Sequence, residues 1–274
     1  MTTVLRVDGG SVARLEDAVA VEEPLEIRLN GFSFAVLMRT PGDDEALAAG
    51  FLFAERVIAA ARDIERLEPC TDADHPHARN VVNVTLGGEA AARLERTLTE
   101  RRCVVTNSSC GVCGRLSIES LQVHAPFIDG AFSVSADVVR ALPETLRRQQ
   151  SLFNTTGGLH GAGLFRRDGA CVSAFEDVGR HNAVDKLVGS ALLSGSLPAS
   201  DLMLAVSGRA SFELVQKAFL AGIPLLAAVS APSSLAIQLA EAAGITLIGF
   251  VRQGSFNMYT HERRVSGDRQ LIIG

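Results

Sequence analysis

The sequence predicts an α/β protein in which a three-layer sandwich with a mostly parallel sheet follows a smaller α+β N-terminal region. Two patterns lead to this fold class: short apolar runs alternate with single helical segments in the second half, and the first half mixes strand and helix signals. With 274 residues and 47% hydrophobic content, the chain can bury one large core or two modest ones. We therefore expect an α+β domain over 1–130 and an α/β domain over 131–274.

The N-terminal region begins with a hairpin signal. Asn30-Gly31 separates two strand-like runs, and this dipeptide favours the tight turn that joins antiparallel strands. The remaining elements expected in this half are a helix over 43–56, an irregular stretch over 70–80, a strand over 81–86, a helix over 89–101 and a strand over 102–106.

The second half is more regular. It opens with a helix over 136–150 that Pro143 either breaks or starts, and continues with a hairpin over 161–175 that turns at Asp168-Gly169. Helices are then expected over 180–193, 211–221 and 233–243, alternating with strands over 202–206, 225–229 and 246–251. Strands separated by single helices imply right-handed parallel crossovers.

Charge and composition narrow the possible functions. The formal net charge of −5 provides no overall positive field for a nucleic acid or an anionic membrane. The N-terminal segment lacks the apolar run of a secretory signal, and no segment reaches the length of a membrane span. Five cysteines, an odd number, fit reduced thiols better than a secreted disulfide framework. We therefore expect a soluble cytoplasmic protein.

The turns that follow the predicted strands combine small residues with arginine. In a parallel sheet these turns meet at one edge, where small residues let backbone N–H groups approach an anion and arginine adds fixed charge. Each turn alone could be ordinary helix capping, but three arginines at three turns favour a phosphate-bearing ligand. Neither a P-loop nor a dinucleotide fingerprint is present. The candidate ligand-binding residues in these turns are Arg180, His181, Ser207, Gly208, Arg209, Ser230, Arg252, Gln253, Gly254 and Ser255.

Cys110 and Cys113 form a Cys-x-x-Cys pair in a loop rich in glycine and small polar residues. An accessible thiolate can accept a sulfur atom as a persulfide, and a second thiol can resolve that species by exchange. A structural zinc site would need two more ligands, and no second pair with suitable spacing exists. A thioredoxin-like redox pair has the same spacing and stays open, although Gly111 and Gly114 disfavour the helix that such a motif begins.

Several ordered segments together resemble the formate dehydrogenase accessory sulfurtransferases, the FdhD family. The resemblance covers most of the chain and rests on SCGVCG at 109–114, TGGLHGAGLF at 156–165, EDVGRHNAVDKLVG at 176–189, SGRASFELVQKA at 207–218 and GFVRQGSFNMYT at 249–260. It implies a cytosolic homodimer with a cytidine-deaminase-like core. Such a protein would receive persulfide sulfur from a cysteine desulfurase and pass it to the bis-molybdopterin guanine dinucleotide molybdenum cofactor, bound as substrate, for formate dehydrogenase.

The resemblance also assigns residues. It implies that Cys110 carries the persulfide with Cys113 as its partner, and that the cofactor, or a guanine nucleotide as its analogue, binds the segment Phe250, Val251, Arg252, Gln253, Gly254 and Ser255. Deamination is disfavoured because neither His160 nor His181 begins a His-x-Glu segment and Ser109 stands where a zinc deaminase has proline. A cofactor chaperone without sulfur chemistry and a thiol–disulfide oxidoreductase remain as alternative functions.

Overall fold

The computed structural model describes residues 1–72, 74–92, 94 and 126–267. Cys110 and Cys113, most of the helix expected over 89–101 and the strand expected over 102–106 lie outside these residues; within them, residues 88–92 are helical.

A six-stranded sheet forms the centre of the second half, in the order β13-β12-β11-β10-β8-β9. Its strands are β8 (His160–Phe165), β9 (Cys171–Asp177), β10 (Met203–Val206), β11 (Leu225–Ala228), β12 (Thr246–Gly249) and β13 (Asn257–Met258). Only β10/β11 and β11/β12 pair in parallel, whereas β8/β9, β8/β10 and β12/β13 are antiparallel. The prediction of a mostly parallel sheet was wrong because the hairpin β8-β9 joins the sheet beside β10 instead of standing apart from it.

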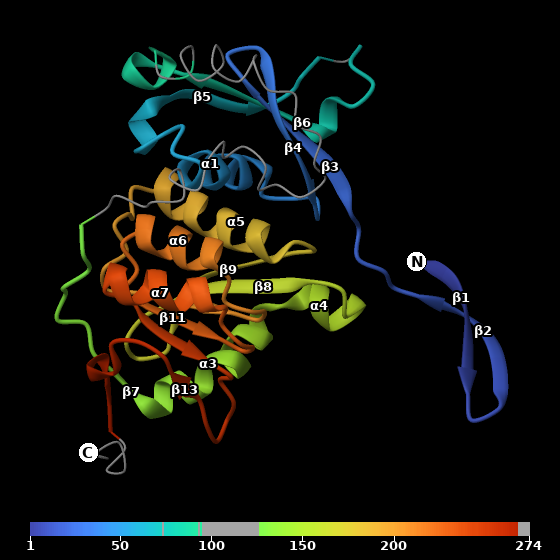
Figure 1. Cartoon of the computed structure of the whole chain (residues 1–274). Helices are drawn as coiled ribbons and strands as arrows, with labels where there is room; N and C mark the ends of the chain where they lie inside the picture. The colour runs from blue at the N-terminus through green and yellow to red at the C-terminus, as the bar shows by residue number, and fades with distance from the viewer. Residues whose placement is uncertain (73, 93, 95–125, 268–274) are drawn as a thin grey trace.

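Helices cover both faces of this sheet, as the predicted three-layer sandwich requires (Figure 1). The helices α5 (Arg180–Leu193), α6 (Phe212–Leu220) and α7 (Ser234–Ala243) lie on one face, and α3 (Ala136–Gln149) lies on the other. Alternate strand residues point to opposite faces. In β10, for example, Leu204 and Val206 belong to the core under α5–α7, while Met203 and Ala205 belong to the core under α3.

The helix α3 continues through Pro143 without a break. A short helix, α4 (Ser151–Thr156), follows after Gln150 and ends at Gly157, whose left-handed backbone (φ 69°) suits glycine. The turn expected at Asp168-Gly169 is present between β8 and β9, with Gly169 at φ 84°. The backbone N–H of Arg166 donates to the carbonyl of Ala170 across this turn, which confirms the predicted hairpin.

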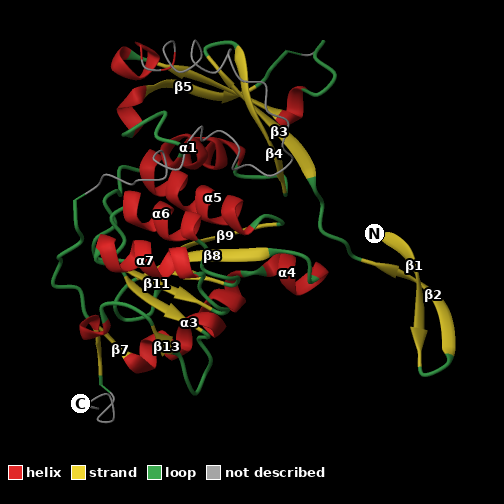
Figure 2. Cartoon of the chain, in the orientation of Figure 1, coloured by secondary structure: helices red, strands yellow, loops and turns green. Residues whose placement is uncertain are grey.

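A four-stranded sheet, in the order β4-β3-β6-β5, forms the N-terminal region (Figure 2). The Asn30-Gly31 turn joins β3 to β4 as predicted, and the Asn30 side chain accepts a hydrogen bond from the backbone N–H of Leu86. The strand β5 was not predicted, because half of its residues are charged. The elements here are β3 (Glu23–Leu29), β4 (Phe32–Arg39), α1 (Asp44–Ala54), η1 (Ala61–Asp63), β5 (Ile64–Pro69), η2 (Ala78–Asn80) and β6 (Val81–Leu86).

The helix α1 lies between the N-terminal sheet and α5, and two glycines allow the two helices to approach closely (Figure 1). A Cβ atom at Gly50 would lie 1.9 Å from the carbonyl oxygen of Asp185. A Cβ atom at Gly189 would lie 1.9 Å from the carbonyl oxygen of Ala46. No other residue could occupy these positions without separating the helices, so the two glycines fix the N-terminal sheet against the α/β core.

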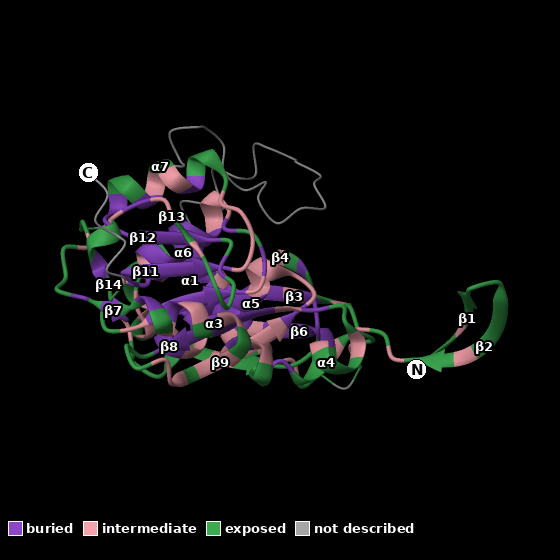
Figure 3. Ribbon diagram, turned by 90° about the horizontal axis from the view of Figure 1, so that it is seen from below, coloured by how far each residue is buried: buried purple, intermediate pink, exposed green. Residues whose placement is uncertain are grey.

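An N-terminal hairpin formed by β1 (Thr2–Asp8) and β2 (Ser11–Asp17) extends away from the body, and its residues are almost all exposed (Figure 3). This hairpin was not predicted. At the other end of the described chain, β7 (Val134–Ser135) pairs with β14 (Val265–Ser266), which follows the turn η4 (Glu262–Arg264). None of the helices in the described ranges has the length and apolar composition that crossing a membrane requires.

Candidate functional site

A cavity of about 640 Å³ opens at the edge of the central sheet where β10, β11 and β12 end. Ser207 lines it after β10, Val229 after β11, and Val251, Arg252 and Gln253 after β12. His160, the first residue of β8, lines the same cavity because β8 runs antiparallel to β10. Strand-following turns that lie far apart in the sequence thus meet at one site, which is the arrangement expected at strand ends in open α/β sheets.

The opposite wall of the cavity comes from the end of α3, from α4 and from the loop 157–159. The Arg147 guanidinium lies 3.9 Å from the centre of the Phe153 ring, so a cation and an aromatic face stand together on this wall. Apolar side chains such as Leu146 and Leu159 complete it. The volume lies within the range of about 300–1,000 Å³ that is usual for sites binding a small organic ligand.

The predicted cofactor segment forms a closed turn at the mouth of the cavity. The Arg252 guanidinium donates to the carbonyls of Val229 (2.5 Å) and Val251 (2.9 Å), and the Arg252 backbone N–H donates to the carbonyl of Ser255 (2.8 Å). Phe250 has a left-handed backbone (φ 52°) and a 42% exposed side chain. Of the six residues in this segment, Phe250, Gly254 and Ser255 do not line the cavity.

The three turns are linked to one another through the backbone. The N–H of Ser230 donates to the carbonyl of Gly208 (3.2 Å), and the N–H of Phe250 donates to the carbonyl of Ser230 (3.2 Å). Gly208 and Ser230 therefore connect the turns without lining the cavity.

A second cluster of predicted residues surrounds His160 on the α5 and α6 side of the sheet. A Cβ atom at Gly208 would lie 3.4 Å from His160 Nδ1 and 3.7 Å from Arg180 Cδ, which places these three residues together. Burial lowers the pKa of His160 below its usual value, and the positive charges of Arg180, His181 and Arg209 lower it further. Burial and these positive charges therefore favour the neutral form of His160. His160 was not among the ligand-binding candidates of the sequence analysis.

His181 faces α6 instead of the cavity. Its Nε2 atom lies 2.9 Å from a carboxylate oxygen of Glu213 and 3.2 Å from the hydroxyl of Ser211. The hydrogen bond between His181 and Glu213 is the main reason that the pKa of Glu213 lies below its usual value. Of the ligand-binding candidates, Ser207, Val251, Arg252 and Gln253 line the cavity, whereas Arg180, His181 and Arg209 belong to the neighbouring cluster.

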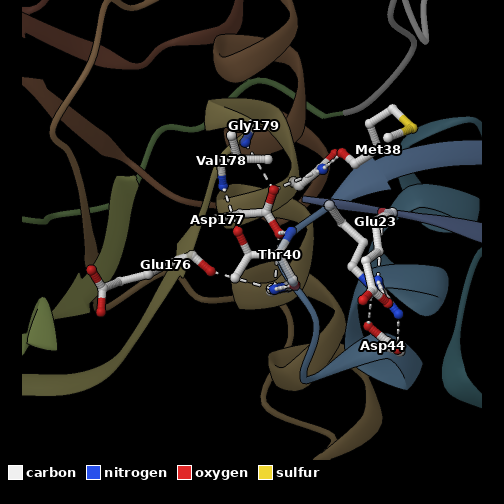
Figure 4. Close-up of polar contacts among 11 residues, drawn as sticks. Glu23, Met38, Thr40, Asp44, Glu176, Asp177, Val178 and Gly179 are labelled. Carbon is white, nitrogen blue, oxygen red and sulfur yellow. Dashed lines mark hydrogen bonds and ion pairs between the residues drawn. The ribbon is translucent and has the colours of Figure 1, made fainter. Parts of the chain in front are cut away.

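Asp177 and Lys186, from the same sequence segment as His181, form a buried ion pair (2.9 Å), and neither residue lines the cavity. The Asp177 carboxylate also accepts from the backbone N–H groups of Thr40 (3.1 Å) and Gly179 (2.8 Å) and from Asn182 Nδ2 (2.9 Å) (Figure 4). These contacts join the end of β4 to the turn before α5. Their role is to hold the N-terminal sheet on the core.

The sequence analysis missed the cavity residues contributed by the α3–α4 wall, namely Arg147, Gln150 and Phe153. No local pattern marks them: Arg147 lies in the last turn of α3, Gln150 follows that helix, and Phe153 lies in the short helix α4. Cys110 and Cys113 are outside the described residues. Among the residues that the structure describes, no group of three or more His, Cys, Asp or Glu side chains could hold a metal ion.

Comparison with known proteins identifies relatives over nearly the whole chain. A model of the FdhD/NarQ family matches residues 20–266. The sulfur carrier protein FdhD of Streptomyces avermitilis is 50% identical over 268 residues, covering 96% of this chain and 94% of that protein. The sulfur carrier protein FdhD of Anaeromyxobacter dehalogenans is 49% identical over 269 residues, covering 96% of this chain and 92% of that protein.

A solved structure shares the fold. The crystal structure of a protein from Desulfotalea psychrophila, assigned as a formate dehydrogenase accessory protein, matches with a TM-score of 0.74 and 25% identity. The match covers 97% of this chain and 98% of that one. The mixed α/β architecture is therefore shared with that protein, whereas the expected likeness to cytidine deaminases stays a prediction.

Proposed function

This chain belongs to the FdhD/NarQ family, and from that premise we propose that it is a sulfurtransferase acting for formate dehydrogenase. In this proposal Cys110 accepts sulfur as a persulfide from a cysteine desulfurase. The sulfur then passes to the bis-molybdopterin guanine dinucleotide molybdenum cofactor, which binds as substrate with a guanine nucleotide portion in the cavity at the strand ends.

The observation that carries the proposal is the cavity, which combines nucleotide-sized space with fixed positive charge. Its volume of about 640 Å³ is suited to one nucleotide-sized portion of a larger cofactor. Arg147 and Arg252 line it, and a planar arginine fork is well matched to a phosphate group. Arg252 is held by two backbone carbonyls, so its position is set before any ligand binds.

The sulfur chemistry follows from two thiols at Cys-x-x-Cys spacing. The Cys110 thiolate attacks the outer sulfur of the donor persulfide, the donor sulfur–sulfur bond breaks, and the donor cysteine leaves as a thiolate. The Cys113 thiolate then attacks the inner sulfur of the Cys110 persulfide, which forms a Cys110–Cys113 disulfide and releases hydrosulfide. The two thiols together supply the two electrons that reduce the transferred sulfur, and the molybdenum of the cofactor takes the hydrosulfide as a ligand.

A labelling experiment tests this function. The purified protein is incubated with a cysteine desulfurase and ³⁵S-cysteine, and bound sulfur that a reductant releases is counted, with guanosine diphosphate binding measured in parallel. We expect Cys110→Ala to abolish the label and leave nucleotide binding intact, whereas Cys70→Ala, a change at a half-buried cysteine of the N-terminal region, keeps both.

Two other outcomes would contradict the proposal. Loss of label and nucleotide binding together in Cys110→Ala would indicate a structural cysteine. Nucleotide binding with no label in the wild-type protein would indicate a cofactor chaperone.

A further inference from the structure

Gln150 is a buried polar residue of the cavity wall that no sequence pattern identified. It stands between α3 and α4, where its backbone N–H donates to the carbonyl of Arg147 (3.1 Å) and its carbonyl accepts from the N–H of Asn154 (3.0 Å). The residue is 4% exposed and lines the cavity. Its backbone is therefore fixed by both helices, and its side chain is directed toward the sheet.

The Gln150 carboxamide rests on the backbone of Gly161 in β8. A Cβ atom at Gly161 would lie 2.6 Å from Gln150 Cδ and 2.7 Å from Nε2, so the amide occupies the space that a side chain would fill. Gly161 is itself held by Ser207, because its N–H donates to the Ser207 hydroxyl (2.9 Å) and its carbonyl accepts from the Ser207 N–H (3.0 Å). The Gln150 amide thus packs on a backbone segment that two hydrogen bonds fix in place within the cavity.

The Nε2 atom of Gln150 is buried and has no hydrogen-bond acceptor among the residues that the structure describes. Buried polar groups are nearly always hydrogen bonded, and an unsatisfied donor is unfavourable. Because the atom belongs to a side chain that lines a cavity, an occupant of that cavity can supply the missing acceptor.

The surroundings indicate what kind of acceptor fits. Gln150 is neutral and its neighbours on the wall, Leu146 and Leu159, are apolar, whereas the cavity already offers Arg147 and Arg252 to a phosphate. A neutral donor in apolar surroundings suits an uncharged carbonyl on a flat ring. The carboxamide also presents a donor and an acceptor side by side, the complement of a ring carbonyl next to a ring N–H.

Resting on the function proposed above, we propose that Gln150 is a specificity-determining residue of the cavity. Its Nε2 donates to the ring carbonyl, and its Oε1 accepts from the adjacent ring N–H, of the 2-amino-4-oxopyrimidine ring shared by guanine and pterin. Gln150 thus selects the ligand by its base, while Arg147 and Arg252 bind its phosphates.

Isothermal titration calorimetry on the full chain tests this contact with two nucleotides. Guanosine diphosphate carries the ring carbonyl, and the diphosphate of 2-aminopurine riboside lacks it. We expect Gln150→Leu and Gln150→Met to weaken guanosine diphosphate binding by about tenfold or more, because a buried hydrogen bond is lost. The same variants should bind the 2-aminopurine nucleotide as weakly as the wild-type protein does. Gln149→Leu, the same change at the exposed neighbouring glutamine, should alter neither.

Three further measurements decide the remaining outcomes. Pyrophosphate affinity should be the same in the wild type and in Gln150→Leu; an equal loss for pyrophosphate would make Gln150 a phosphate contact and overturn the proposal. Biopterin as a second probe shows whether the pterin or the guanine occupies the site, and dependence on Gln150 for either supports the proposal. If a Gln150 variant unfolds cooperatively and binds guanosine diphosphate as tightly as the wild type, the base contact is refuted but the proposed function is not. If the wild-type protein binds neither probe, the proposed function is refuted as well.

Discussion

Replacement of Asp177 by asparagine should destabilise the protein severely without touching the cavity. The Asp177 carboxylate is 0% exposed and Lys186 is 1% exposed, and the carboxylate accepts from four donors: Lys186, Thr40, Gly179 and Asn182. Asparagine has one side-chain oxygen to accept hydrogen bonds, and its N–H₂ group would face donors instead of acceptors. The Lys186 ammonium then stays buried without its counter-charge.

Breaking a buried ion pair by removing one partner costs about 3–5 kcal/mol. That is a large part of the stability of a typical domain, about 5–15 kcal/mol. For a chain of this size, each kcal/mol lowers the melting temperature by about 2–4 °C, so Asp177→Asn should melt about 6–20 °C below the wild type. Asp177 joins the end of β4 to the turn before α5, so the loss should affect the whole molecule and not one loop.

Urea unfolding followed by circular dichroism gives the free energy of unfolding for the comparison. The matched control is Asp201→Asn, which breaks the exposed Arg167–Asp201 pair (2.7 Å) and should cost at most about 1 kcal/mol. A cost for Asp177→Asn no greater than that of Asp201→Asn would refute the assignment of this network as the joint between the N-terminal sheet and the core.

Three further predictions follow from the site and its supports. Folding lowers the pKa of His160, so the unfolded chain binds a proton more readily than the folded chain as pH falls through about 6.5. In thermal unfolding, the stability of the wild type relative to His160→Asn should therefore decrease as the pH is lowered from 7.5 to 5.5. A difference in stability that does not change with pH would contradict the burial of this histidine. Gly50→Ala should cost about 1–3 kcal/mol by forcing α1 from α5, whereas Gly130→Ala, where a Cβ meets nothing, should be close to neutral in urea unfolding. Arg252→Ala should weaken guanosine diphosphate binding by about tenfold or more in calorimetry, while Arg263→Ala, at an exposed arginine, should leave it unchanged.

The alternation of helices and strands in the second half could be predicted because each element carries its own local periodicity. The directions of the strands could not be predicted, because the alternation of helices and strands is the same whether or not the hairpin β8-β9 joins the sheet. That choice depends on the pairing of Ala162 and Leu164 with β10, a contact between segments about 40 residues apart. The hairpin β1-β2 was missed because its residues alternate weakly and bury almost nothing.

The same limit applies to the site. Ser207, Arg252 and Gln253 could be predicted together because the turns after neighbouring strands must meet at one edge. Gln150 and Arg147 reach that edge only because α3 crosses the opposite face, and no local signal in the sequence reports a crossing. Asp177 and Lys186 lie in the same short segment as Arg180, yet they point into the joint with β4, so proximity in sequence did not imply a shared role.

The most direct test of the account is a crystal of the full chain soaked with guanosine diphosphate. The account predicts density for the nucleotide between the α3–α4 wall and the ends of β10–β12, with its phosphates near Arg252 and its base at Gln150. A nucleotide bound elsewhere on the molecule, or an unliganded cavity in a crystal whose protein binds the nucleotide in solution, would contradict it.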